Sequence, residues 1–202
     1  MLIRELGLFS GFYLTNNFLE NYFNKKNARN IVSGTHAFTC VLLNSGYLIT
    51  GYPLLNTISH NFSSSFFIYD IYYILRNGNL NFLKYCYLYH HAAAIYLIKN
   101  SYLVGNFNLI LFTAELSNLP SYIVYHNMNK DIKTQKTEEN IKYYKKIQKV
   151  LYGLIRAPYM TYLLTDTLLS MNFNNISSYY LLFTSLPVYL MGLGWTFKLL
   201  TE

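Results

Sequence analysis

The chain has 202 residues, of which 52% are hydrophobic, 18% are aromatic and only 12% are charged, and its net charge is +7. A soluble domain carries roughly twice that charged fraction, so the composition is typical of a multi-pass membrane protein. The positive charge does not indicate nucleic-acid binding, because the basic residues lie in short connectors between apolar segments.

Windows of about 17 to 22 residues predict seven membrane helices along the chain. The first, at residues 4–20, is the least apolar, because Asn16, Asn17 and Glu20 crowd its end, and it either crosses the membrane or lies at its interface. The others are predicted at residues 31–52, 57–75, 82–98, 107–127, 150–170 and 178–199. We therefore expect an all-α, multi-pass transmembrane bundle of six to seven helices. A weak N-terminal membrane helix and a basic connector occupy residues 1–30, and one membrane domain occupies residues 31–202.

Residues 128–149 form a cytosolic Lys-rich loop that contains seven of the sixteen Lys and Arg residues. Its sequence predicts an amphipathic helix that lies on the membrane surface and contacts anionic headgroups. With seven crossings, thirteen basic residues fall on one side and only Arg4 and Lys99 on the other, while Arg156 stays inside a helix. The positive-inside rule then predicts a cytosolic C-terminus and an exterior N-terminus. Six crossings would reverse only the N-terminus.

Several ionisable side chains fall inside the predicted helices, where facing lipid costs each of them at least about 2.5 kcal/mol. They are therefore expected to face the protein interior, a partner or water. The rise of about 1.5 Å per residue from each helix midpoint sorts them into three layers. His90, His91 and Glu115 lie near the midplane, His36, Asp70 and Arg156 about 6 Å toward the cytosol, and His60 and Asp166 about 9 Å toward the other side.

Two pairs are expected from the outer layers. Asp70 and Arg156 form the natural ion pair, because each would otherwise be an uncompensated buried charge. His60 and Asp166 form the second pair. His36 is expected either to hydrogen-bond between helices or to line a functional pocket.

At the midplane, His90 or His91 with Glu115 makes a histidine–carboxylate pair, an arrangement that orients an imidazole. Neighbouring side chains on a helix point about 100° apart, so one histidine is expected to face a cavity while the other bonds an adjacent helix. Adjacent histidines are poorly spaced for one metal ion, and the chain has no CxxC, HExxH, GxSxG or Gly-rich phosphate-loop motif. Neither a metal nor a cofactor is therefore expected.

Five stretches are similar to those of a known family in their order and spacing, and they extend from about residue 30 to the end of the chain. They are SGTHAF (33–38), FSSSFFIYDIYYIL (62–75), YHHAAAIYLI (89–98), TAELSNLPSY (113–122) and LPVYLMGLGWTFKLL (186–200). Together they resemble the TLC domain (TRAM–LAG–CLN), a family of multi-pass, lipid-associated proteins that includes the ceramide synthases. Ceramide synthases carry a histidine and paired aspartates after the double histidine, where this chain has AELSNLP. The chain is therefore more similar to the smaller, TLC-domain-only branch.

The resemblance implies a helix bundle around a lipid-accessible cavity, in the endoplasmic reticulum or a related membrane. It also implies that Asp70, His90, His91 and Glu115 match the polar positions of the family and line this cavity. The residues expected at the lipid cavity are His36, Asp70, Asn118 and Arg156, and those expected to act on a substrate are His90, His91 and Glu115.

Two functions stay open from the sequence. In the first, the protein binds, senses or transports a membrane lipid, such as a sphingolipid, a sterol or an acyl lipid, without covalent chemistry. In the second, it is an acyl-CoA-dependent lipid N-acyltransferase, with acyl-CoA as co-substrate. His90 or His91 would then be the base or nucleophile, with Glu115 or Asp70 orienting it. A translocation accessory protein, as in the TRAM branch, would not need midplane histidines.

Overall fold

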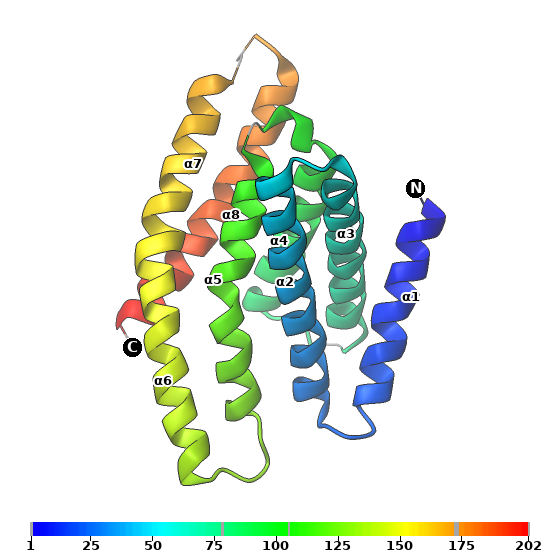
Figure 1. The fold of residues 1–202 in the computed structure, drawn as a ribbon, viewed down its shortest axis with the longest axis vertical. Coiled ribbons are helices and arrows are strands. Elements are labelled where there is room, and N and C mark those ends of the chain that lie inside the picture. The colour runs from blue at the N-terminus through cyan, green and yellow to red at the C-terminus, as the bar shows by residue number, and fades with distance from the viewer. Residues whose placement is uncertain (1, 78, 105, 172–173, 202) are drawn as a thin grey trace.

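The computed structural model describes residues 2–77, 79–104, 106–171 and 174–201, and these ranges contain helices and connectors but no strand. The elements are α1 (Leu2–Leu19), α2 (Lys25–Thr50), α3 (Pro53–Arg76), α4 (Phe82–Lys99), the 3₁₀ turn η1 (Ser101–Leu103), α5 (Phe107–Met128), α6 (Gln135–Leu151), the π turn η2 (Tyr152–Arg156), α7 (Ala157–Ser170) and α8 (Ile176–Thr201). Because α6, η2 and α7 run on without a break, they form one rod (Figure 1). The described residues thus fold into seven long helices, which confirms the predicted all-α class.

The helix boundaries follow from local capping chemistry. Asn24, Asn81 and Thr134 precede α2, α4 and α6, and the side chain of each accepts a hydrogen bond from a backbone N–H in the first turn. Gly51 ends α2 in the left-handed region, at φ 67°, which glycine adopts without steric cost. Pro53 then begins α3, where its missing N–H has no helical partner to lose.

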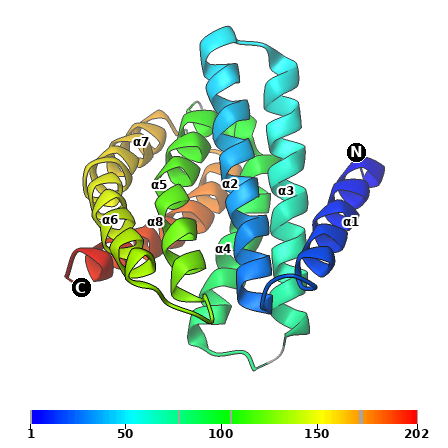
Figure 2. The same cartoon turned by 60° about the horizontal axis from the view of Figure 1, so that its bottom comes forward.

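The helices alternate in direction, so successive connectors lie at opposite ends of the bundle. In Figure 2, α2 lies between α5 and α3, and α1 lies on the outer side of α3. The connectors α1–α2, α3–α4 and α5–α6 share one end (Figure 1), and half of the Lys and Arg residues of the chain lie in or next to these connectors. At the other end, Lys99 of α4 lies 3.9 Å from the Glu5 carboxylate of α1. We call these the basic end and the opposite end.

Small and polar side chains hold α2 against α3 and α5. Asn44 donates to Ser59 at 2.8 Å, and the Cys40 thiol lies 2.9 Å from the Ser63 hydroxyl. On the other face of α2, a Cβ on Gly34 would lie only 3.3 Å from the Cβ of Tyr122, so glycine permits the close approach of α2 and α5. This combination of small residues with hydrogen-bonding residues is typical of helices that pack in a membrane.

By length and composition alone, α8 is the one described helix that qualifies as a membrane span. A single such helix is weak support for a membrane location, since core helices of soluble proteins meet the same criterion. The multi-pass arrangement therefore stays a prediction.

The Lys-rich segment forms the expected helix, α6, but does not turn aside to lie across an end of the bundle. It runs straight into α7 and packs along α5, where Gln148 donates to the Ser121 hydroxyl at 2.7 Å (Figure 1). The helix predicted at 150–170 therefore continues a longer rod that begins at Gln135.

Besides Pro53, three prolines lie in helices: Pro120 in α5, Pro158 in α7 and Pro187 in α8. Each lacks the N–H that would bond the carbonyl four residues earlier. In α8 that carbonyl belongs to Phe183, and it accepts a hydrogen bond from the Tyr89 hydroxyl of α4 at 3.2 Å. Just before Pro158 the helix widens into η2, where the N–H of Ala157 bonds the carbonyl of Tyr152, five residues earlier.

Candidate functional site

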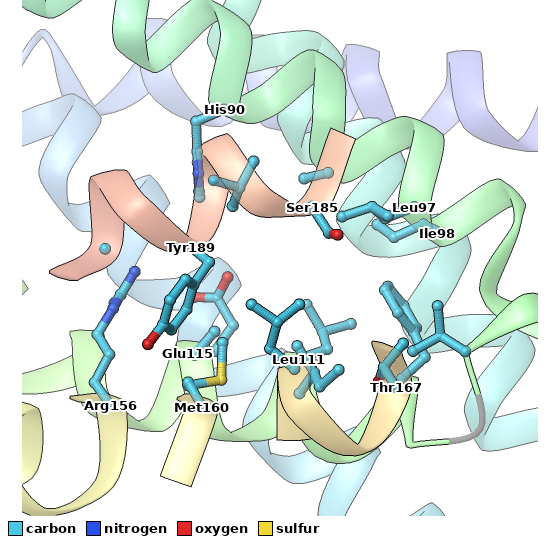
Figure 3. A pocket seen from close by; sticks show the side chains of 18 of the residues that line it. His90, Leu97, Ile98, Leu111, Glu115, Arg156, Met160, Thr167, Ser185 and Tyr189 are labelled. Atoms are coloured by element: carbon cyan, nitrogen blue, oxygen red, sulfur yellow. The ribbon is translucent and has the colours of Figure 1, made fainter. Parts of the chain in front are cut away.

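A cavity of about 140 Å³ lies between α4, α5, α7 and α8 (Figure 3). Its wall is mostly apolar. The apolar side chains come from one face of each helix, as the spacing on α7 shows: Met160 and Leu164 are four residues apart, and Thr167 follows three residues later. On α8 the lining residues extend from Leu181 to Leu193, which corresponds to about 18 Å along the helix. The cavity is therefore elongated along the helix axes.

Polar side chains gather at one end of this cavity. His90 of α4, Glu115 of α5, Arg156 of η2 and Tyr189 of α8 lie together there, whereas Leu97, Ile98 and Thr167 lie at the other end (Figure 3). We call the first group of four the polar end. Helix direction places the polar end near the middle of the bundle and the apolar part toward the opposite end, near the connectors that precede α5 and α8.

Arg156 is buried and held by neutral partners. Its Nη1 donates to the Asn118 side-chain oxygen at 2.6 Å and lies 3.3 Å from the Tyr152 hydroxyl, and its guanidinium stacks over the Tyr152 ring at 4.9 Å. The Tyr152 hydroxyl also donates to Asn118, at 2.6 Å. The guanidinium also lies against Gly192 of α8, where a Cβ would lie 3.6 Å from Nε and 3.9 Å from Nη2. Those two nitrogens are thus left toward α8 and the cavity.

Glu115 is the acidic residue of the polar end and is only 6% exposed. Its Oε2 is buried and has no hydrogen-bond partner among the described residues. It lies at the same end of the cavity as Arg156, and no direct ion pair joins the two residues. A buried carboxylate oxygen with an open acceptor position is costly unless a ligand or water satisfies it.

The two adjacent histidines are divided as their 100° offset predicts. His90 lines the cavity, with its ring edge-on to Trp195 at a centroid distance of 5.8 Å. Its Nδ1 has no hydrogen-bond partner in the part of the chain that the structure describes. His91 instead points toward α3, where its Nε2 lies 2.8 Å from the Asp70 carboxylate. No hydrogen bond or ion pair between described residues joins either histidine to Glu115, so the expected histidine–carboxylate pair is not formed.

The predicted ion pair between Asp70 and Arg156 is wrong. Asp70 binds Arg29 of α2 through two contacts of 2.8 Å, Nε to Oδ1 and Nη2 to Oδ2. Together with His91, this makes a buried three-helix cluster of α2, α3 and α4 outside the cavity wall. We call it the Arg29–Asp70–His91 cluster. Each charge has its partner, so the cluster acts as a structural clamp.

The predicted pair of His60 and Asp166 is also wrong, although both residues bond to the start of α5. His60 lies 2.9 Å from the side-chain oxygen of Asn108, and Asp166 accepts a hydrogen bond of 2.8 Å from Asn106. The two expected partners thus contact α5 or its N-terminal connector from α3 and α7, and not each other.

His36 and Asn118, two of the residues expected at the lipid cavity, do not line its wall. His36 is buried between α2 and α3, where its ring stacks on Phe66 at 3.9 Å and its Nε2 lies 3.2 Å from the Cys40 thiol. Asn118 contributes indirectly, because it holds Arg156 in place. Of the four residues expected there, Arg156 is the one on the wall.

The sequence interpretation missed Tyr189, Tyr152 and Arg29. Tyr189 lines the cavity, and its hydroxyl hydrogen-bonds Thr161 across the gap between α8 and α7. Tyr152 lies near the start of the helix predicted at 150–170, and its type alone does not mark it as a site residue. The proline two residues after Arg156 does indicate a local irregularity of the helix. Within the described ranges, no three His, Cys, Asp or Glu side chains converge as metal ligands would.

No protein-family model, curated protein or solved structure matches this chain. The chemistry that the site can perform is therefore inferred from its geometry. That geometry is an elongated apolar cavity with one basic, one acidic and one imidazole side chain at a single end.

Proposed function

We propose that this chain is a multi-pass membrane protein that binds a membrane lipid, with the alkyl chain in the cavity and the headgroup at the polar end. The observation that carries the proposal is the division of the cavity into a long apolar part and a polar end. An alkyl chain gains free energy from apolar surroundings, while a headgroup needs hydrogen-bonding partners. The amphiphilic cavity matches both needs in one ligand.

The outer surface supports a membrane location. Large apolar side chains are exposed along the outward faces of the helices, and on α8 Phe183 and Phe197 are 70% and 71% exposed. An apolar surface of this kind marks a lipid-facing or partner-facing region. The concentration of Lys and Arg at the basic end fits contact with anionic headgroups on the cytosolic side. The resemblance to the TLC domain supports the same proposal and adds an expected role in sphingolipid or acyl-lipid homeostasis, in the endoplasmic reticulum or a related membrane.

The length of the cavity is compatible with an acyl chain. Lining residues extend over about 12 Å on α4 and about 18 Å on α8. A cavity of about 150 Å³ accommodates a benzene ring, so this one encloses about six carbons of such a chain, and a longer chain extends beyond it.

Native mass spectrometry of the protein purified in a mild detergent tests this function. The wild type should retain a co-purified lipid. Ala94→Phe, which fills the cavity from α4, should remove that lipid without lowering the unfolding temperature. Ala92→Phe is a matched control, because Ala92 is exposed on the same helix and does not line the cavity. Equal lipid retention in all three proteins would contradict the proposed site.

His90 favours one second candidate, the acyl-CoA-dependent N-acyltransferase. A histidine with an open ring nitrogen on the wall of a lipid cavity, beside Glu115, could accept the proton of an attacking amine. Incubation with acyl-CoA and a sphingoid base should then yield an amide and release the CoA thiol, and His90→Ala should abolish both. His91 would act as a positioning residue, since its Nε2 is committed to Asp70. Absence of product from the wild type would leave lipid binding without catalysis.

A further inference from the structure

With Glu115 ionised, the charges at the polar end balance to zero. Arg156 carries a permanent positive charge, and Glu115 is the acidic residue among the described residues of the wall. A neutral imidazole at His90 adds one donor and one acceptor but no charge. Buried charges that compensate each other tolerate a neutral neighbour, whereas an added ion leaves one charge unbalanced.

Both a donor edge and an acceptor oxygen lie at this end of the cavity. Nε and Nη2 of Arg156 are turned toward Gly192 and the cavity, away from the partners of Nη1. Oε2 of Glu115 is buried without a partner among the described residues. A neutral headgroup that accepts from Arg156 and donates to Glu115 satisfies both.

Building on the lipid-binding function proposed above, we propose that the cavity selects an uncharged single-chain amphiphile whose headgroup both donates and accepts hydrogen bonds. A primary amide or an alcohol has this chemistry. A carboxylate of the same chain length would accept from Arg156 but repel Glu115. An alkyl ammonium would donate to Glu115 but repel Arg156. Each ion would also lose its hydration without a compensating opposite charge.

The chain carries its own probe of this site. Trp195 is the single tryptophan, and its ring contacts both His90 and Tyr87 beside the polar end. Quenching of its fluorescence by a brominated alkyl chain therefore reports occupancy near the polar end. Ala94→Phe, with the cavity filled, gives the quenching that arises from the detergent micelle alone.

The experiment compares brominated dodecanamide, dodecanoate and dodecylamine in a neutral detergent at about pH 8, where the last two are charged. The amide should bind the wild type at least about tenfold more tightly than either ion, as expected for an unbalanced charge in a buried site. Glu115→Gln should raise the affinity for dodecanoate, because the positive charge of Arg156 then lacks a negative counter-charge. Arg156→Met should raise the affinity for dodecylamine, because the negative charge of Glu115 then lacks a positive counter-charge.

Shifts in opposite directions cannot come from a general loss of folding, and two further variants serve as controls. Arg156→Lys keeps the charge and should keep the preference for the amide. Thr167→Val lies at the other end of the cavity and should leave the ranking of headgroups unchanged.

Equal affinity for the three probes would overturn the headgroup selectivity and leave lipid binding intact. Tightest binding of dodecanoate by the wild type would also overturn it, since Arg156 would then act as an anion site. Failure of all three probes to quench Trp195, together with no co-purified lipid in native mass spectrometry, would overturn the proposed function itself.

Discussion

The Asp70 carboxylate of α3 holds the Arg29 guanidinium of α2 in a two-point ion pair, with both nitrogen–oxygen distances at 2.8 Å. His91 of α4 adds a third contact to the same carboxylate. Three neighbouring helices are thus joined at one buried group, whose side chain is only 4% exposed. Arg156, by contrast, is bonded to α5 and shares no partner with Asp70.

Asp70→Asn should lower the free energy of unfolding by about 3 kcal/mol, because it leaves Arg29 without its counter-charge. Part of the Arg29 side chain, 34%, reaches the surface, so a larger loss is not expected. Thermal or denaturant unfolding in detergent measures the change. A double-mutant cycle with Arg29→Met should give a coupling energy above about 1 kcal/mol, and one with Arg156→Met a value near zero. Stronger coupling to Arg156 would restore the pairing that the sequence suggested.

Tyr89→Phe should lower the free energy of unfolding by about 1 kcal/mol. The carbonyl of Phe183 then loses the hydrogen bond that replaces its missing helical partner. Pro187→Ala restores an N–H four residues after that carbonyl. In the Pro187→Ala background, Tyr89→Phe should therefore have little effect on unfolding. The same cost in both backgrounds would show that Tyr89 contributes by packing alone.

Gly192→Ala should weaken ligand binding about tenfold, because the added methyl covers Nε and Nη2 of Arg156 and blocks roughly one hydrogen bond to the headgroup. The protein should stay folded, since a contact of 3.6 Å is ordinary van der Waals packing. Titration with a brominated alkyl amide and Trp195 fluorescence measures the loss. Gly194→Ala is the control two residues away, because its new methyl would meet nothing within 4 Å. Equal losses in the two variants would point to a general effect on α8.

Water-soluble maleimides should label cysteines at Ile132 and Tyr102 from opposite sides of the membrane. Both residues are 80% exposed, and they lie in the α5–α6 and α4–α5 connectors. Ile132→Cys should react from the cytosolic side only, and Tyr102→Cys from the exterior side only, in a Cys86→Ser background. Cys40 stays in place because it is fully buried. Labelling of both positions from one side would refute the multi-pass topology.

The positions of the helices could be predicted well from the sequence. Long apolar windows and capping residues fix where a helix begins and ends, so the predicted helix at 57–75 corresponds to Pro53–Arg76 and that at 82–98 to Phe82–Lys99. Polar residues such as Asn24 fall outside an apolar window, and that is why α2 begins earlier than predicted. Arg29 consequently belongs to the second turn of α2, although it had been placed in a connector.

The pairing of buried charges could not be predicted, because depth along an axis does not say which helices are neighbours. Asp70 and Arg156 were assigned to the same layer, yet α3 packs against α1, α2 and α4, whereas η2 packs against α5 and α8. Rotation about the helix axis was also unknown. The offset between His90 and His91 predicted two different surroundings, and only the three-dimensional packing assigned His90 to the cavity and His91 to Asp70.

The π turn η2 fixes the rotational register between the two halves of the rod. A π turn holds one residue more than an α turn, so the faces of α6 and α7 are offset by about 100° relative to an uninterrupted helix. Loss of a single residue from Tyr152–Arg156 would leave the faces of α7 where they are, whereas closing the turn into regular α-helix with all five residues kept would rotate all of α7. Met160, Leu164 and Thr167 would then leave the cavity wall together. The orientation of α7 toward the cavity thus depends on the π turn at Tyr152–Arg156, which offsets the one extra residue that it contains.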